Sequence, residues 1–279
     1  MTAPLNPPLL LTSDLPSFVL GFGTGQTADL LKVIISASQQ IERETRRYFV
    51  PRDQTRYFNG RQWGNGGRAV GTELYLDRDL QTLTTVTNGD LATVSSDDYT
   101  LAPRNSDTGK TIIRLTTDSG LVWTNGTSDS EGISLAGTWH YGGGWRDTGL
   151  AASAIASTTT TSITVSGASI IAGTILKIDS EYLYTEVGSA TALTVSRGYL
   201  GSTAATHSAS ATVYRWECDS QVQALTTRVV TTMLERFKSP LYGQVQIGDL
   251  SIPISVDRLP DDIRLDLAQL RFVSRFGAA

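Results

Sequence analysis

Histidine and cysteine are scarce in this chain of 279 residues, and each shortage excludes a class of site. Two histidines, His140 and His207, are too few for a histidine metal cluster. The single cysteine, Cys218, can form neither an internal disulfide nor a cysteine-rich zinc site. The sequence therefore disfavours metalloproteins and disulfide-stabilised scaffolds, and it predicts neither a metal nor a cofactor.

Long apolar runs and an excess of positive charge are also missing. There is no stretch of about 20 apolar residues that could cross a membrane, and the proline-rich N-terminus lacks the basic residues of a secretion signal. The formal net charge is −4, whereas dedicated nucleic-acid binders are usually basic. We therefore expect a protein with no membrane segment, made in a reducing cytoplasm. At roughly 150 residues per domain, its length suggests about two domains.

Three segments have the apolar repeat of an amphipathic helix: residues 27–49, residues 217–238 and a last helix that begins at Pro260. The first has one continuous face, made of Leu30, Ile34, Ala37, Ile41 and Thr45. The second has a stripe made of Val222, Leu225, Val229, Met233 and Phe237. The last has two nearly opposite stripes, Ile263, Leu267 and Leu270 on one side and Leu265, Phe272 and Phe276 on the other. A helix that is apolar on two sides needs two packing partners.

Strands and turns are predicted between these helices. Residues 55–140 alternate polar and apolar side chains, and Asn88-Gly89 predicts a hairpin with a type I′ turn. Residues 151–216 are rich in β-branched residues and predict a small β-domain. We divide the chain into an extended arm (1–26), a first part of the core with a helix and a β-layer (27–150), an inserted β-domain (151–216), a core helix (217–240) and a C-terminal arm and helix (241–279).

Catalytic motifs are weak throughout. Gly21 and Gly23 precede a helix as in a dinucleotide-binding loop, but the third glycine position carries Gln26 and no repeated βαβ units follow. Neither histidine lies in a recognisable triad context, which favours a turn or packing role for both. Cys218 precedes a helix, although a lone cysteine is usually a small buried hydrophobe. We therefore expect a protein that is not an enzyme.

Arginine dominates the basic residues, since only four of the 23 are lysines. Arginine suits planar, bidentate pairing at interfaces, and composition drift in a GC-rich genome is the alternative explanation. The candidate subunit-interface residues are Arg43, Arg46, Arg47 and Arg228.

The order of these segments resembles a known family. The first helix LLKVIISASQQIERETRRYF is followed by DDYTLAP and GTWHYGGG, then by the helix QVQALTTRVVTTMLERF and the arm GDLSIPISVD. Together, residues 27–145 and 217–276 resemble the head–tail connector (adaptor, or head-completion) proteins of tailed bacteriophages. The intervening ILKIDSEYLYTEV and its neighbours are similar to small β-modules of phage virion proteins.

This resemblance implies a structural role. The fold would be α+β, with a helical adaptor core, an antiparallel β-layer, an inserted all-β domain and a C-terminal docking arm and helix. About twelve copies would form a ring in the neck of the virion, assembled from chains made in the host cytoplasm. The ring would join the portal protein to a stopper or tail-terminator protein and extend the channel for double-stranded DNA, without binding that DNA specifically.

The C-terminal helix is the expected contact with the portal, because its two apolar sides suit a groove of another protein. The predicted portal-docking residues are Ile263, Arg264, Leu267, Leu270, Arg271, Phe272, Arg275 and Phe276. Another neck, tail or baseplate protein, whose β-module binds a partner or a host surface, is the alternative. An enzyme would be the third class, and it would depend on His140 and His207.

Overall fold

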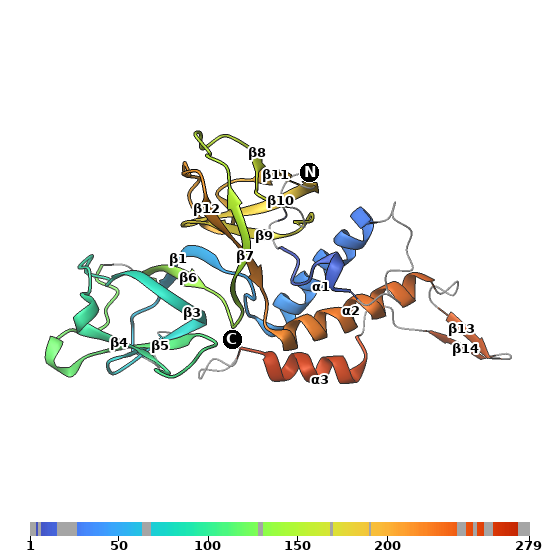
Figure 1. Ribbon diagram of the computed structural model, residues 1–279. Helices are drawn as coiled ribbons and strands as arrows, with labels where there is room; N and C mark the ends of the chain where they lie inside the picture. Colours follow the sequence, from blue (N-terminus) through green and yellow to red (C-terminus); the bar gives the residue numbers. More distant parts are fainter. Residues whose placement is uncertain are drawn as a thin grey trace.

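The protein consists of two antiparallel sheets and a small layer of helices (Figure 1). The computed structural model describes residues 4, 7–15, 27–62, 68–127, 131–167, 170–189, 191–238, 244–247, 250–253 and 259–272. Each sheet has six strands, and three helices accompany them in the described residues. The expected α+β fold with a helical core is therefore wrong, because the chain is predominantly β.

The helices form at the predicted segments, with shifted ends. They are α1 (Thr27–Thr45), α2 (Ser220–Lys238) and α3 (Asp261–Leu270). All five residues of the predicted α1 face are buried, as a face that repeats every 3.6 residues requires. The helix ends four residues earlier than predicted, because Arg46 takes a φ of 56° and the chain then turns Phe49 and Val50 into the core.

Sheet 1 is built from residues 52–139. Its strands are β1 (Arg52–Phe58), β2 (Ala69–Val70), β3 (Glu73–Thr87), β4 (Tyr99–Ala102), β5 (Lys110–Leu115) and β6 (Ile133–Trp139). The strand order is β1-β6-β3-β5-β4, with β2 paired to β3. The long β3 pairs with β5 in its first half and with β6 in its second half. The register shifts between Tyr75 and Leu80 in the pairing with β5, and again between Leu80 and Thr82 in the pairing with β6. Alternate residues of β6 are buried, as expected for a strand with one face on a core.

The turn after β3 differs from the predicted type. Gly89 lacks the positive φ that a type I′ turn requires, and Leu91 instead has a φ of 67°. The Leu91 N–H donates to the Asn88 carbonyl at 2.9 Å, and the Val94 N–H donates to the Val86 carbonyl at 2.9 Å. The hairpin is therefore present, but its turn is longer than two residues.

Sheet 2 follows directly and closes on itself. Its strands are β7 (Gly144–Ala152), β8 (Ser162–Thr164), β9 (Ile175–Ile178), β10 (Glu181–Ser189), β11 (Ala192–Ser196) and β12 (Ala211–Glu217). The strand order is β7-β12-β9-β10-β11-β8, and Ala152 pairs with Val165 to join the two outer strands. The Ser166 N–H donates to the Ala151 carbonyl at 2.9 Å, which completes the closure.

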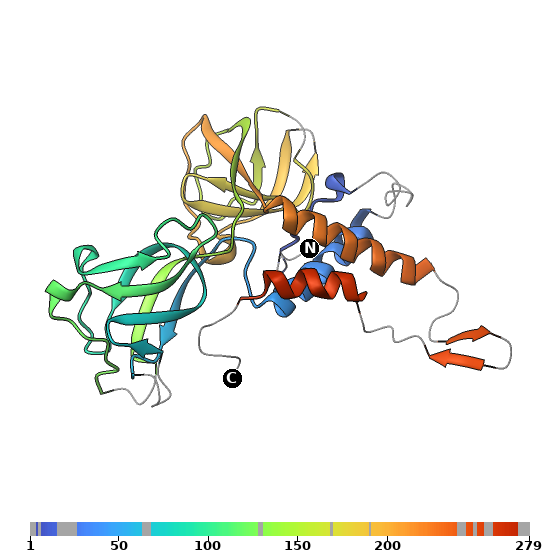
Figure 2. The same ribbon diagram turned by 90° about the horizontal axis from the view of Figure 1, so that it is seen from below.

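Three hydrophobic cores stabilise these parts. Sheet 1 and the interior of sheet 2 each enclose their own core. The third core joins the three helices to the outside of sheet 2, where Tyr182, Tyr184, Tyr199 and Trp216 contact it. A small hairpin of β13 (Gln244–Ile247) and β14 (Leu250–Pro253) lies between α2 and α3 in the chain, away from the body in both views (Figures 1 and 2).

Candidate functional site

Helix α3, the predicted portal contact, lies beside α1 and α2 with one face buried (Figure 2). Ile263, Leu267 and Leu270 are buried in the core that the three helices share. These apolar side chains therefore already pack against other residues of the same chain. A second protein could reach them only if α3 left its place.

The end of α3 is fastened to the end of α1. The Phe272 N–H donates to the Thr45 carbonyl at 2.7 Å, and the buried Phe272 ring lies 5.6 Å from the Arg47 guanidinium. Phe272 thus closes the helical layer in this chain. Arg275 and Phe276, also predicted to dock on the portal, lie outside the described residues.

The opposite side of α3 faces solvent and borders a groove. Leu265 is 66% exposed, so this member of the second predicted stripe of α3 is not packed within the chain, whereas Phe272 of the same stripe is buried. The groove has a volume of about 590 Å³ and lies between α1 and α3. Its lining consists of Gln40, Glu44, Leu259, Asp261, Arg264, Leu265, Leu267, Ala268 and Arg271. Of the predicted docking residues, Arg264 and Arg271 are therefore at the surface.

The four candidate interface arginines divide into two pairs. Arg228 binds Asp262 at 2.5 Å and also binds Asp266, which ties α2 to α3. Arg47 lies 3.3 Å from Asp79 of β3, and its guanidinium stacks 3.9 Å above the Tyr141 ring. Both are thus engaged within the chain.

Arg43 and Arg46 are different, because both are exposed at the end of α1. Neither forms an ion pair with any residue that the structure describes. They remain available to a partner.

Two buried acid–arginine pairs connect the helices to sheet 1. Burial raises the pKa of Asp79 to about 6, although the neighbouring Arg47 lowers it. Glu42 of α1 accepts hydrogen bonds from Arg52 at 2.8 Å and from the Phe49 N–H at 3.3 Å. Burial raises the pKa of Glu42 as well, and Arg52 opposes that rise. These pairs hold the junction at which the chain passes from α1 into β1.

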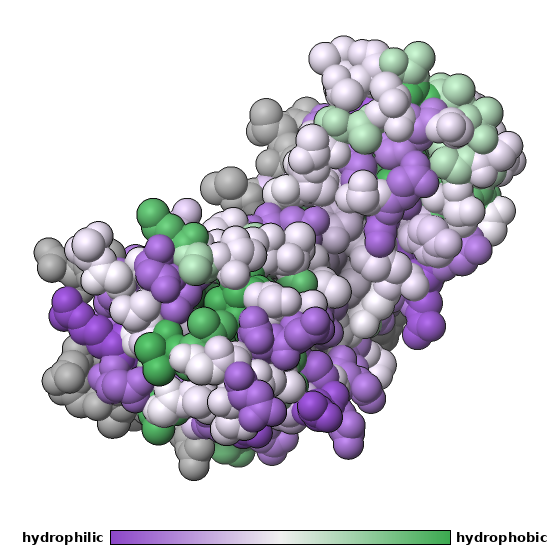
Figure 3. All heavy atoms as spheres, turned by 90° about the vertical axis from the view of Figure 1, so that its left-hand side faces the viewer, coloured by the Kyte–Doolittle hydropathy of each residue, from purple (hydrophilic) through white to green (hydrophobic). Residues whose placement is uncertain are grey.

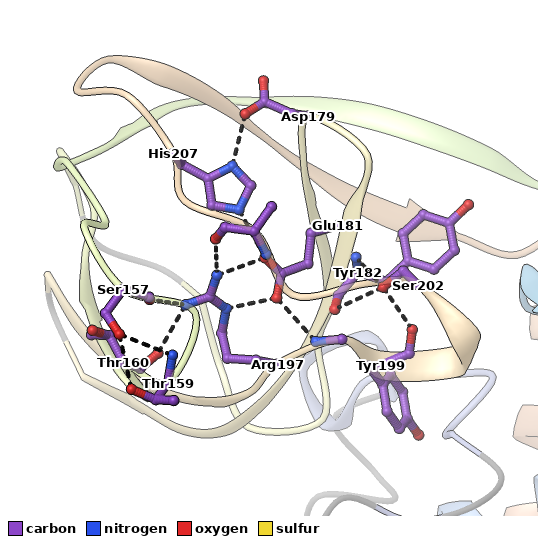
Figure 4. A network of polar contacts seen from close by, with 12 residues as sticks. Ser157, Thr159, Thr160, Asp179, Glu181, Tyr182, Arg197, Tyr199, Ser202 and His207 are labelled. Carbon is purple, nitrogen blue, oxygen red and sulfur yellow. Dashed lines mark hydrogen bonds and ion pairs between the residues drawn. The ribbon is translucent and has the colours of Figure 1, made fainter.

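A buried polar network that was not predicted from the sequence lies in sheet 2 (Figure 4). Both oxygens of the buried Glu181 accept from Arg197, whose Nε and Nη2 lie 2.6 Å away. Arg197 also donates to three backbone carbonyls, those of Ser157, Thr160 and Ala205. One ion pair thus joins the β7–β8 loop, the β11–β12 loop and the start of β10 at this end of the sheet.

His207 extends this network. Its Nδ1 lies 2.7 Å from the Asp179 carboxylate, and its Nε2 lies 2.8 Å from Glu181 Oε2. The Gly198 and Ala205 N–H groups donate to Glu181 as well, each at 3.0 Å. Burial alone would raise the pKa of Glu181, but these hydrogen bonds, led by those from Arg197, lower it to about 2. A carboxylate with five donors has no lone pair directed at a substrate, so the network is structural.

Cys218 and His140 are also poorly placed for catalysis. Burial raises the pKa of Cys218 to about 12, so its thiol is protonated at neutral pH and is a weak nucleophile. Burial lowers the pKa of His140 to about 4, and its Nδ1 lies 2.8 Å from the Gly142 carbonyl. The predicted glycine-rich loop at residues 21–23 lies outside the described residues.

Within the described residues, no group of three or more His, Cys, Asp and Glu side chains is arranged so that it could hold a metal ion. None of the helices described is both long and apolar enough to cross a bilayer. No protein-family model matches the chain, and no curated protein is similar to it.

Proposed function

We propose that this chain is a structural protein in the neck of a tailed-bacteriophage virion. Several copies would form a ring that joins the portal to a stopper or tail-terminator protein and leaves a channel for DNA. The sequence resemblance suggests this role, and the saturated polar network around Glu181 fits a mechanical part better than an enzyme.

The β13–β14 hairpin is the observation that carries the proposal. It follows α2, where the resemblance places an arm that reaches the portal, and it lies away from the body (Figures 1 and 2). A two-stranded hairpin is marginally stable in water by itself, and each of its outer strand edges can pair with another chain. A hairpin in this position therefore gains stability by adding a strand from a partner.

The charge of the chain is compatible with a DNA channel. Each phosphate that a protein neutralises adds salt-dependent affinity, which would slow the passage of DNA. The formal net charge of −4 per chain makes any ring of identical copies acidic. We therefore expect no tight binding of duplex DNA by the ring at physiological salt.

The direct test exchanges the hairpin. Replacing residues 243–254 with a Gly/Ser linker of equal length leaves Ile263, Leu267 and Leu270 in place, whereas deleting residues 260–279 would open the core. We expect the linker chain to keep its thermal midpoint and lose binding to the portal ring of its own phage. The matched control is Val187→Thr, a change at an exposed residue of sheet 2 far from the hairpin in the chain.

A reconstruction of the whole particle tests the location. Density for this chain in a ring directly below the portal is the expected result. Density at the tail tip or baseplate would reject the adaptor role and support the alternative of a tail component. Undiminished portal binding by the linker chain would reject the hairpin as the contact.

A further inference from the structure

Sheet 1 ends in an exposed apolar tip, which we define as the turn 88–92 and the loop 120–126. Leu91 in the turn is 83% exposed, and Val122 in the loop is 67% exposed. Figure 3 looks onto the sheet 1 end of the molecule and shows hydrophobic side chains gathered on its lower part. Leu91 also has a φ of 67°, which is unfavourable for any residue with a branched apolar side chain. A strained backbone that directs a leucine into water suggests a binding role.

The tip is rigid, because the buried amide of Asn88 joins its two segments. Asn88 Nδ2 donates to the Val122 carbonyl at 2.9 Å, and Asn88 Oδ1 accepts from the Thr124 N–H at 3.2 Å. The Gly89 N–H donates to the Thr124 carbonyl at 3.1 Å, so close that a Cβ on Gly89 would lie 2.2 Å from that oxygen. Leu91 and Val122 are therefore held in fixed positions before any partner arrives, which lowers the entropy lost on binding.

The groove between α1 and α3 has matching chemistry on the other side of the molecule. Leu265 and Ala268 provide exposed apolar lining, and the volume of about 590 Å³ admits side chains of this size. Sheet 1 and the helices lie on opposite sides of the molecule in Figures 1 and 2. Tip and groove thus cannot meet within one chain without a rearrangement of the fold.

The charges around the two surfaces are of opposite sign. In the turn 88–92 and in residues 117–126, the charged side chains are Asp90 and Asp118, both exposed. The groove lining carries two acidic residues, Glu44 and Asp261, and two basic residues, Arg264 and Arg271, of which Arg264 pairs with Asp261 at 3.1 Å. The exposed Arg43 and Arg46 at the neighbouring end of α1 therefore give this side an excess of positive charge. Acidic side chains beside the apolar tip and arginines beside the apolar groove favour one orientation of contact.

We propose that the tip of one copy inserts Leu91 and Val122 into the α1–α3 groove of the next copy. The contact joins two different surfaces, so it is heterologous, and repeated rotation about one axis closes such contacts into a ring. This inference rests on the ring in the proposed function and names the surfaces that form it.

The test measures self-association of the full chain by native mass spectrometry and sedimentation over a concentration series. The tip variant is Leu91→Asn with Val122→Thr, because asparagine tolerates the positive φ and should preserve the turn. The groove variant is Leu265→Gln with Arg271→Glu, and Val187→Thr is the control, which changes one exposed apolar side chain of sheet 2 outside both surfaces. We expect the tip and groove variants each to weaken association about tenfold or more, and the control to leave it unchanged.

Mixing the two variants gives the sharpest result. A tip variant still has its groove and a groove variant still has its tip, so an equal mixture should stop at one-to-one dimers. Larger mixed assemblies, unchanged association of either variant, or an equal loss in the control would overturn the proposal. A wild-type chain that stays monomeric would also overturn the proposal. If that monomeric chain still bound the portal, the proposed function would stand. Self-association through the tip without portal binding would reject the function alone.

Discussion

Replacing Glu181 with glutamine should destabilise sheet 2 strongly. The carboxylate is buried and accepts five hydrogen bonds, two from Arg197, one from His207 and one each from the Gly198 and Ala205 N–H groups. A glutamine amide has one oxygen, so its NH₂ must face two or more of these donors in either orientation. Arg197 would also keep its buried charge without a counter-ion.

Two routes give a similar magnitude for this loss. The pKa of Glu181 falls from its usual 4.5 to about 2, because the hydrogen bonds outweigh the effect of burial. At about 1.4 kcal/mol per pKa unit, this lowering corresponds to roughly 3 kcal/mol. Removing one partner of a buried ion pair costs about 3–5 kcal/mol in other proteins. We therefore expect the free energy of unfolding to fall by about 3 kcal/mol at pH 7.

The assay is urea unfolding followed by tryptophan fluorescence between pH 7 and pH 2.5. A lowered carboxyl pKa stabilises the fold above pH 4.5, and this stability is lost as the pH falls from 4.5 towards 2. The difference between Glu181→Gln and wild type should therefore shrink over that range. Glu186→Gln is the matched control on the same strand, since an amide oxygen can still accept from Ser196 Oγ. Equal stabilities at pH 7, or an equal loss in the control, would refute the structural role of Glu181.

Three further changes test the junction and the helical layer. Burial raises the pKa of Asp79 to about 6. The free energy of unfolding should therefore fall by up to about 3 kcal/mol as the pH rises from 3.8 to 6. In urea titrations, Asp79→Asn should remove this pH dependence. Burial lowers the pKa of His140 to about 4, so stability should fall as the pH drops from 6.5 to 4, and His140→Gln should flatten this part of the profile. Leu267→Ala should cost about 2–4 kcal/mol in thermal unfolding because Leu267 is buried, whereas the exposed Leu265→Ala should change stability by less than about 0.5 kcal/mol.

Helix periodicity was the most reliable information in the sequence. A buried face that repeats every 3.6 residues is a local pattern, and it located α1 and α2 to within four residues at each end. The same pattern overestimated how much of α3 is buried, since Leu265 belongs to its second apolar stripe but faces solvent. Periodicity identifies an apolar side chain, but the surrounding fold decides whether anything covers it.

The predicted fold class was wrong because the resemblance gave the helices too much weight. The intervening segments do alternate in burial, as in β6, yet strand alternation does not tell how many strands join one sheet. The Glu181–Arg197–His207 network could not be predicted either, because its members lie at the start of β10, after β11 and before β12 and meet only in the folded sheet. The exposed tip was missed for a related reason, since a standard type I′ turn would not place Leu91 at a positive φ.

The chain enters and leaves sheet 2 at adjacent points. Gly144, the first residue of β7, is the Cα partner of Glu217, the last residue of β12. Partners in an antiparallel pair lie about 5 Å apart, so a turn of a few residues could bridge the gap if the intervening strands were absent. A gene could thus acquire or lose this whole segment without re-routing the rest of the polypeptide. The aromatic face of Tyr182, Tyr184 and Trp216 would have to be gained or lost with it, since these rings cover the helices.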